Sequence, residues 1–141
     1  MISYINAINV TIIFLLLIYA SYTDVVYRKI KNKCVLWVLI FSFLLGLSYG
    51  GINIVAPAIF LIIGYVISIL GGIGAGDVKL VFALLIGIPD ALIFNFFIMT
   101  CLLGIPVALC CLIISKLIIK SDFKTVPFGI AIAIGYITVT I

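Results

Sequence analysis

Histidine and glutamate are both absent from this chain of 141 residues, and its four acidic side chains are all aspartates. Without histidine, the chain cannot build a serine or cysteine triad of the usual kind. Its four cysteines form no C-x-x-C pair, so we predict no metal site and no cofactor. Any acid–base chemistry would therefore depend on the aspartates.

Charged residues are also scarce. Only 9% of the residues are charged and 67% are hydrophobic, whereas a soluble domain is about a quarter charged and about half apolar. Such a chain would expose too much apolar surface in water, which predicts an integral membrane protein, with residues 1–141 as a single domain in a lipid bilayer. The net charge of +4 comes without a basic stripe of interleaved aromatics, so we predict no nucleic-acid partner.

Long apolar runs dominate the sequence, as expected for helices that cross a bilayer and need about 20 apolar residues each. The first positive residue is Arg28, so we interpret the first run as a membrane helix that is retained rather than a removable signal peptide. The fourth run is the weakest span, because it makes only about 16 Å of helix. The predicted fold is an all-α, polytopic membrane bundle of about six transmembrane helices. Its runs are residues 5–22, 34–49, 52–70, 78–88, 91–115 and 126–141.

All eight lysine and arginine residues fall on one side of this six-helix arrangement. The positive-inside rule therefore places that side in the cytoplasm, with the chain in the plasma membrane and both termini outside. A five-helix arrangement that fuses the fourth and fifth runs would put Lys79 and Lys116 on opposite faces. The same alternation places Asp24 and Asp77 together on the cytoplasmic side.

An aspartate at the edge of a bilayer is a functional candidate, because holding a charge there is costly. Asp77 follows Gly74-Ala75-Gly76, where glycines allow a tight backbone turn, and Asp24 lies far away in sequence. Two carboxylates brought within a few ångströms share one proton. The charged carboxylate can take a proton from water, while the protonated one can hydrogen-bond a substrate carbonyl. The pair therefore predicts aspartic hydrolysis if the fold brings the two residues together.

Each of these residues also has a structural interpretation. Asp77 is well placed to cap the helix that follows it. Asp24, just past the predicted end of the first helix, could pair with Arg28 or Lys29. Lys79 could act only through the positive-inside rule, by fixing the orientation of the chain in the membrane, or it could neutralise a nearby carboxylate. The remaining aspartates, which we interpret as a turn charge and a loop charge, are Asp90 and Asp122.

Three segments, in order along the chain, resemble motifs of the type IV prepilin peptidases, which are integral membrane aspartic proteases. Residues 74–80, GAGDVKL, resemble the family's G-x-G-D-x-K-L motif. Residues 24–32, DVVYRKIKN, are similar to the segment that begins at the family's first aspartate. Residues 124–129, KTVPFG, resemble its Pro-Phe-Gly segment.

The resemblance implies that Asp24 and Asp77 are the catalytic pair. It also implies the substrate, a prepilin-like or archaeal flagellin-like precursor with a short basic leader before a long apolar helix. Cleavage would remove the leader at the cytoplasmic face of the membrane. Further residues are implied to support the substrate or the loops of the site. They are Gly74, Gly76, Lys79, Arg28, Pro127, Phe128 and Gly129.

Two departures from the family pattern affect these expectations. Lys31 stands where the family commonly has proline, so the loop after Asp24 is expected to be shaped differently. The chain also lacks the cytoplasmic zinc-binding insertion of the larger members, which N-methylate the new N-terminus as well. We therefore expect a short, peptidase-only form without N-methyltransferase activity.

Three alternatives use the same residues differently. A presenilin-like protease would place both aspartates within helices, whereas we expect Asp24 in a basic loop, and Pro127 is followed by Phe-Gly. A small membrane transporter or proton-relay subunit would use the two aspartates as a relay. A structural assembly protein would carry them without any chemistry.

Overall fold

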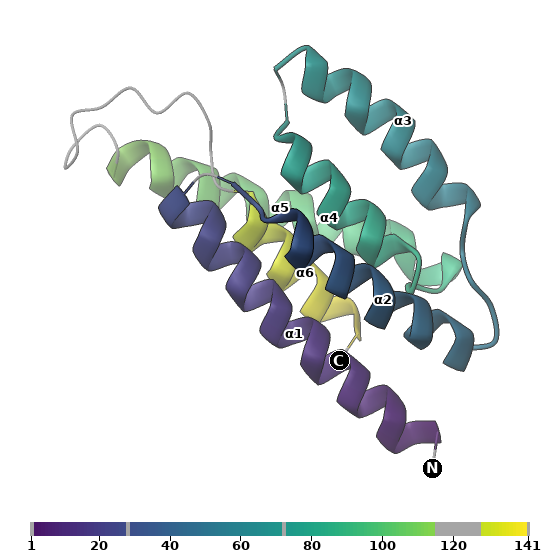
Figure 1. The fold of residues 1–141 in the computed structure, drawn as a ribbon. Coiled ribbons are helices and arrows are strands. Elements are labelled where there is room, and N and C mark those ends of the chain that lie inside the picture. Colours follow the sequence, from purple (N-terminus) through teal and green to yellow (C-terminus); the bar gives the residue numbers. More distant parts are fainter. Residues whose placement is uncertain (1, 28, 72, 115–127, 141) are drawn as a thin grey trace.

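The computed structural model describes residues 2–27, 29–71, 73–114 and 128–140. These residues form six α-helices, which confirms the all-α prediction and the predicted order of the elements (Figure 1). The helices are α1 (Ile2–Tyr27), α2 (Asn32–Ser48), α3 (Val55–Ile69), α4 (Ala75–Leu85), α5 (Asp90–Ile114) and α6 (Gly129–Thr140).

The predicted apolar runs differ from the observed helices mainly at the end of the first helix. Helix α1 continues through Asp24 to Tyr27, so the prediction that Asp24 lies just past the helix end is wrong. No glycine or proline follows Asp24 before the linker, and nothing in the backbone therefore stops the helix there. The hydroxyl of Thr23 also donates to the carbonyl of Ala20 at 3.0 Å, which satisfies this polar side chain inside the helix.

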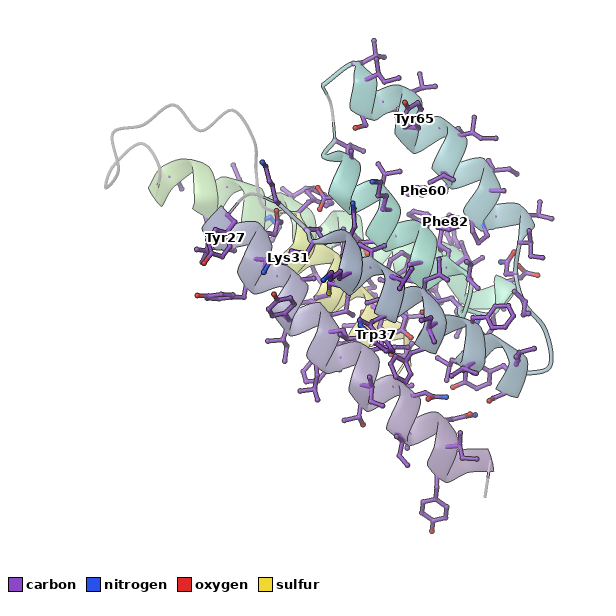
Figure 2. The ribbon with its side chains drawn as sticks, viewed as in Figure 1. Tyr27, Lys31, Trp37, Phe60, Tyr65 and Phe82 are labelled. Atoms are coloured by element: carbon purple, nitrogen blue, oxygen red, sulfur yellow. The ribbon has the colours of Figure 1, made fainter. Side chains whose placement is uncertain are left out.

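Two of the described helices are long and apolar enough to cross a bilayer on length and composition, namely α1 over Tyr4–Tyr27 and α5 over Asp90–Val107. Helices α2, α3 and α6 are apolar but shorter, with 17, 15 and 12 residues, and α4 has 11. Apolar side chains such as Trp37 on α2 and Tyr65 on α3 project from the outer faces and are more than half exposed (Figure 2). This apolar exterior is typical of a membrane protein.

Helices α1, α2, α4 and α6 surround the apolar core. Helix α1 packs on α2 and α6, α2 packs on α4, and α4 touches α6, while α3 lies outside α4 and α5 lies outside α6 (Figure 1). Fully buried side chains from each of the four inner helices fill the centre. They include Leu17, Val38, Leu84 and Tyr136.

Three glycines allow neighbouring helices to approach closely. A Cβ atom at Gly64 would lie 2.8 Å from Val78 Cγ1, at the contact between α3 and α4. A Cβ atom at Gly135 would overlap Thr100 between α6 and α5. Small residues at such crossings permit tight helix packing inside a membrane. The third of these glycines, which would overlap the backbone of α2, is Gly87.

The two ends of the bundle carry different polar features. At one end, the last turns of α1 and the first turns of α2 and α4 line a shared pocket, and the first residue of α6 contacts α1 beside it. At the other end, Asn53 Nδ2 donates to Asp90 Oδ1 at 2.5 Å and ties the α2–α3 connection to the start of α5. Asp90, which we interpreted as a turn charge, is the first residue of α5. The segments that position Asp24 and Asp77 therefore meet at a single end.

Candidate active site

Asp24 lies in the last turns of α1 with only 7% of its surface exposed. Its Oδ2 atom accepts a hydrogen bond of 2.9 Å from the backbone N–H of Gly129, a residue 105 positions later in the chain. Glycine at position 129 eases this approach, because a Cβ atom there would lie 3.0 Å from the same oxygen, which is a tight contact. The sequence resemblance grouped these two residues without predicting the bond between them.

Asp77 lies in the first turn of α4 and is 8% exposed. Gly74 is the N-cap of this helix, and no side-chain cap bond forms there. The interpretation of Asp77 as a helix cap is therefore wrong, because Asp77 is the third helical residue. Its Oδ1 atom is buried without a hydrogen-bond partner among the described residues. A buried polar atom in this state is costly, and such atoms are concentrated at functional sites.

The two aspartates line the same pocket, which has a volume of about 320 Å³. Its walls come from the end of α1, the α1–α2 linker, the start of α2 and the segment before and within α4. The glycines of the GAGD segment make room for these walls. A Cβ atom at Gly74 would lie 2.8 Å from Asp77 Oδ2, and one at Gly76 would lie 3.2 Å from Ile30 Cβ. The residues around the pocket are Asp24, Lys29, Ile30, Asn32, Gly74, Ala75, Gly76, Asp77 and Lys79.

The electrostatics of the pocket act on the carboxyl of Asp77. Asp77 precedes the apolar run 78–88, and burial raises the pKa of its carboxyl above its usual range, with the negative charge of Asp24 as the second cause. Lys29 and Lys79 also line the pocket, and Lys79 Nζ donates to Asn32 Oδ1 at 3.4 Å. Lys79 therefore joins α4 to the start of α2 as well as adding positive charge.

A second, apolar pocket of about 160 Å³ lies on the other side of Asp77, between α3, α4, α5 and α6. Of the residues that the structure describes, Asp77 is the one that lines both pockets. The rings of Phe60 and Phe97 lie 5.3 Å apart at this second pocket, and Phe60 faces α4 from α3 (Figure 2). Phe128 also lines it, packed so closely that a Cβ atom at Gly104 would lie 2.7 Å from its ring.

The structure brings together most of the residues that the sequence singled out. Gly74, Gly76 and Lys79 lie around the polar pocket with the aspartates, Gly129 contacts Asp24, and Phe128 lies at the apolar pocket. The predicted residues outside the described part of the chain are Arg28 and Pro127.

Sequence reasoning missed the contributions of Asn32, Ile30 and the aromatic rings of the apolar pocket. Asn32 is the last residue of the segment DVVYRKIKN, but the resemblance of that segment indicated no role for it. Phe60 and Phe97 gave no signal, because their pattern is that of any apolar membrane helix. Among the described residues, no cluster of three or more histidine, cysteine, aspartate or glutamate side chains could hold a metal ion.

This arrangement can perform acid–base hydrolysis, because two buried carboxylates share one solvent-accessible pocket and the pKa of the Asp77 carboxyl is raised towards the protonated form. Both aspartates also lie within helices, whereas we expected Asp24 in a loop. The position of the aspartates therefore does not distinguish this chain from the presenilin-like alternative.

Comparison with known proteins identifies the family. Searches of curated proteins and of solved structures returned no match. Residues 11–109 match the model of the type IV leader peptidase family, a stretch that includes both Asp24 and Asp77. The enzymes of this family are aspartic-type leader peptidases. A match over this share of the chain shows that the protein belongs to the type IV leader peptidase family.

Proposed function

We propose that this protein is a membrane-embedded aspartic endopeptidase that removes the short basic leader from prepilin-like or archaeal flagellin-like precursors, with residues 1–141 acting as one domain. One observation carries the proposal. Two buried aspartates, from helices far apart in sequence, line a single pocket in a chain of the type IV leader peptidase family.

Asp24 and Asp77 would act as the catalytic pair. Between them they hold one proton, so that one carboxylate activates a water molecule and the other donates a hydrogen bond to the scissile carbonyl. The unpartnered Oδ1 atom of Asp77 supports this assignment, since it leaves a hydrogen-bonding position open for a substrate or a water molecule.

The substrate class agrees with the position of Asp77 between the two pockets. A prepilin-like precursor changes from a polar leader to an apolar helix at the point of cleavage. Here the polar pocket lies on one side of Asp77 and the apolar pocket on the other. An apolar pocket of about 160 Å³ is similar in size to an engineered cavity of about 150 Å³ that binds benzene. We infer that it holds an apolar side chain next to the scissile bond.

The site would face the cytoplasm in a multi-pass protein of the plasma membrane, with both termini outside. The support comes from charge, because Lys29, Lys31, Lys33 and Lys79 all lie at the end of the bundle that carries the aspartates. We propose peptidase activity alone, without N-methyl transfer, because the chain lacks the C-x-x-C pairs of the larger members.

Co-expression with a candidate prepilin tests the proposal, with the mature product detected by its smaller size. Asp24→Asn and Asp77→Asn should each abolish cleavage while leaving expression and membrane insertion intact. Asp90→Asn is the matched control at the opposite end of the bundle and should retain cleavage. Continued cleavage by either variant of the pair would refute the dyad.

A further inference from the structure

The two carboxylates of the pocket have unequal hydrogen bonding. Asp24 Oδ2 accepts a bond of 2.9 Å from the Gly129 N–H, whereas Asp77 Oδ1 is buried without a partner among the described residues. A hydrogen bond donated to a carboxylate stabilises its charged form, while burial without such a bond favours the neutral form. The surroundings therefore favour a charged Asp24 and a protonated Asp77.

The donor to Asp24 lies at the start of a helix. Gly129 is the first residue of the 12-residue helix α6, and the first N–H groups of a helix have no partner within the helix. The positive end of the helix dipole also lies there and favours a negative charge. Helix α6 thus adds two effects that act on Asp24, and both favour its ionised form.

The other charged groups do not produce this difference by themselves. Lys29 and Lys79 share one cavity with both carboxylates, whereas the Gly129 N–H bonds to Asp24 alone. Helix α4 also places Asp77 in the same pocket, where a negative charge on Asp77 would repel one on Asp24. Among the described residues, the polar and charged groups around Asp24 include Asp77, Lys79, Lys29 and the neutral Asn32, together with the Gly129 amide.

We propose that Gly129 is a positioning residue whose amide fixes the roles of the dyad, with Asp24 as the ionised base and Asp77 as the protonated acid. This inference rests on the proposed peptidase function. Asp24 takes a proton from water as the water oxygen bonds to the scissile carbonyl carbon, and Asp77 gives its proton to the carbonyl oxygen. Asp24 then passes its proton to the leaving nitrogen, Asp77 recovers a proton from one hydroxyl of the intermediate, and the C–N bond breaks. Both carboxyl groups return to their starting states.

Two substitutions at one position test the role of the amide. Gly129→Pro replaces the N–H with the ring Cδ atom, which faces Asp24 Oδ2, and proline is well tolerated at the first position of a helix. Gly129→Ala keeps the N–H and adds the same Cβ atom, which would lie 3.0 Å from Asp24 Oδ2 in both variants. Both variants are expected to cleave more slowly because of that atom, so the readout is the pH profile of kcat/KM and not the rate alone.

The acidic limb of the profile reports ionisation of the base. We expect Gly129→Pro to shift this limb upward by about one pH unit relative to Gly129→Ala, because a lost hydrogen bond raises the pKa of the carboxyl that accepted it. Equal shifts in both variants, or no shift in either, would overturn the inference while leaving the peptidase function intact. Failure of the unaltered protein to cleave would instead refute the proposed function.

A second measurement uses the unaltered protein and does not depend on the variants folding. An epoxide reagent is opened by attack of an ionised carboxylate, whereas a diazo ester reacts with a protonated carboxyl group; each forms an ester that peptide mass spectrometry locates. At neutral pH we expect the epoxide on Asp24 and the diazo ester on Asp77. The reverse pattern, or equal labelling of both residues by each reagent, contradicts the assignment of roles.

Discussion

Asp77 occupies a position that reduces the stability of the fold. Its buried carboxyl has an unpartnered oxygen, and burial together with the charge of Asp24 raises its pKa. The folded protein therefore binds a proton at Asp77 more tightly than the unfolded chain does. Stability contributed by that proton is complete below the unfolded pKa of about 3.9, and it is lost as the pH rises through the folded pKa.

Asp77→Asn should remove this pH-dependent loss. The amide cannot ionise, so the variant should melt at a higher temperature than the unaltered protein at pH 8, with a difference that shrinks towards pH 4. Each unit of pKa elevation corresponds to about 1.4 kcal/mol. Thermal unfolding in detergent, followed by the fluorescence of Trp37, measures the difference. A gap that is the same at both pH values would show that Asp77 is not the titrating group.

At the scale of single residues, the sequence pointed to two aspartates that line one pocket, but it did not predict their contacts. The GAGD segment and the shortage of acidic residues were enough to single out Asp24 and Asp77. The interpretation of Asp77 as the N-cap of α4 was wrong, because Gly74, three residues earlier, is the N-cap. The bond from Gly129 to Asp24 depends on where α6 packs against α1, and local sequence does not specify that packing.

The apolar pocket exists only because four helices meet beside Asp77. Helix α3 contributes Phe60, α5 contributes Phe96 and Phe97, and the segment leading into α6 contributes Phe128. These side chains come from separate parts of the chain, so no single segment could indicate the pocket. Helix order and approximate helix limits were predictable from apolar runs, because each run is local.

Filling this pocket should weaken cleavage. Cys101 on α5 lines the pocket and is exposed, so Cys101→Phe can introduce a ring with little disturbance of the core. We expect kcat/KM for the precursor to fall by roughly tenfold, in the range that one misplaced group costs in an apolar pocket.

Cys110→Phe is the matched control for this experiment. Cys110 is an exposed cysteine on the same helix and does not line the pocket. Cleavage of a precursor by the purified variants, with initial rates at several substrate concentrations, measures the effect. Equal losses in the two variants would show that the apolar pocket does not bind the substrate.

For the molecule as a whole, the distribution of lysines leads to a prediction about orientation. Lys33 lies at the end of the bundle that carries the aspartates, and Gly51 lies at the opposite end. In a variant whose native cysteines are replaced, Gly51→Cys should react with a membrane-impermeant maleimide added to intact cells. Lys33→Cys should react only after the membrane is opened. Labelling in the opposite order would reverse the proposed orientation.

The all-α architecture followed from composition, since few charges and many apolar residues leave helices as the main way to satisfy the backbone in a membrane. The number of complete crossings was harder to predict. Helix length alone supports α1 and α5, and the 11 residues of α4 form a segment of about 16 Å. Asp77 lies in the first turn of this short helix and lines both the polar pocket and the apolar one.

The contact between Asp24 and Gly129 joins the first helix to the last across 105 positions. During synthesis, therefore, Asp24 lacks this amide partner until α6 has been made and has packed against α1. Under the proposed division of roles, a copy that ends before Gly129 would carry both aspartates and lack the hydrogen bond that favours an ionised Asp24. We therefore expect peptidase activity to appear only late in the synthesis of the chain.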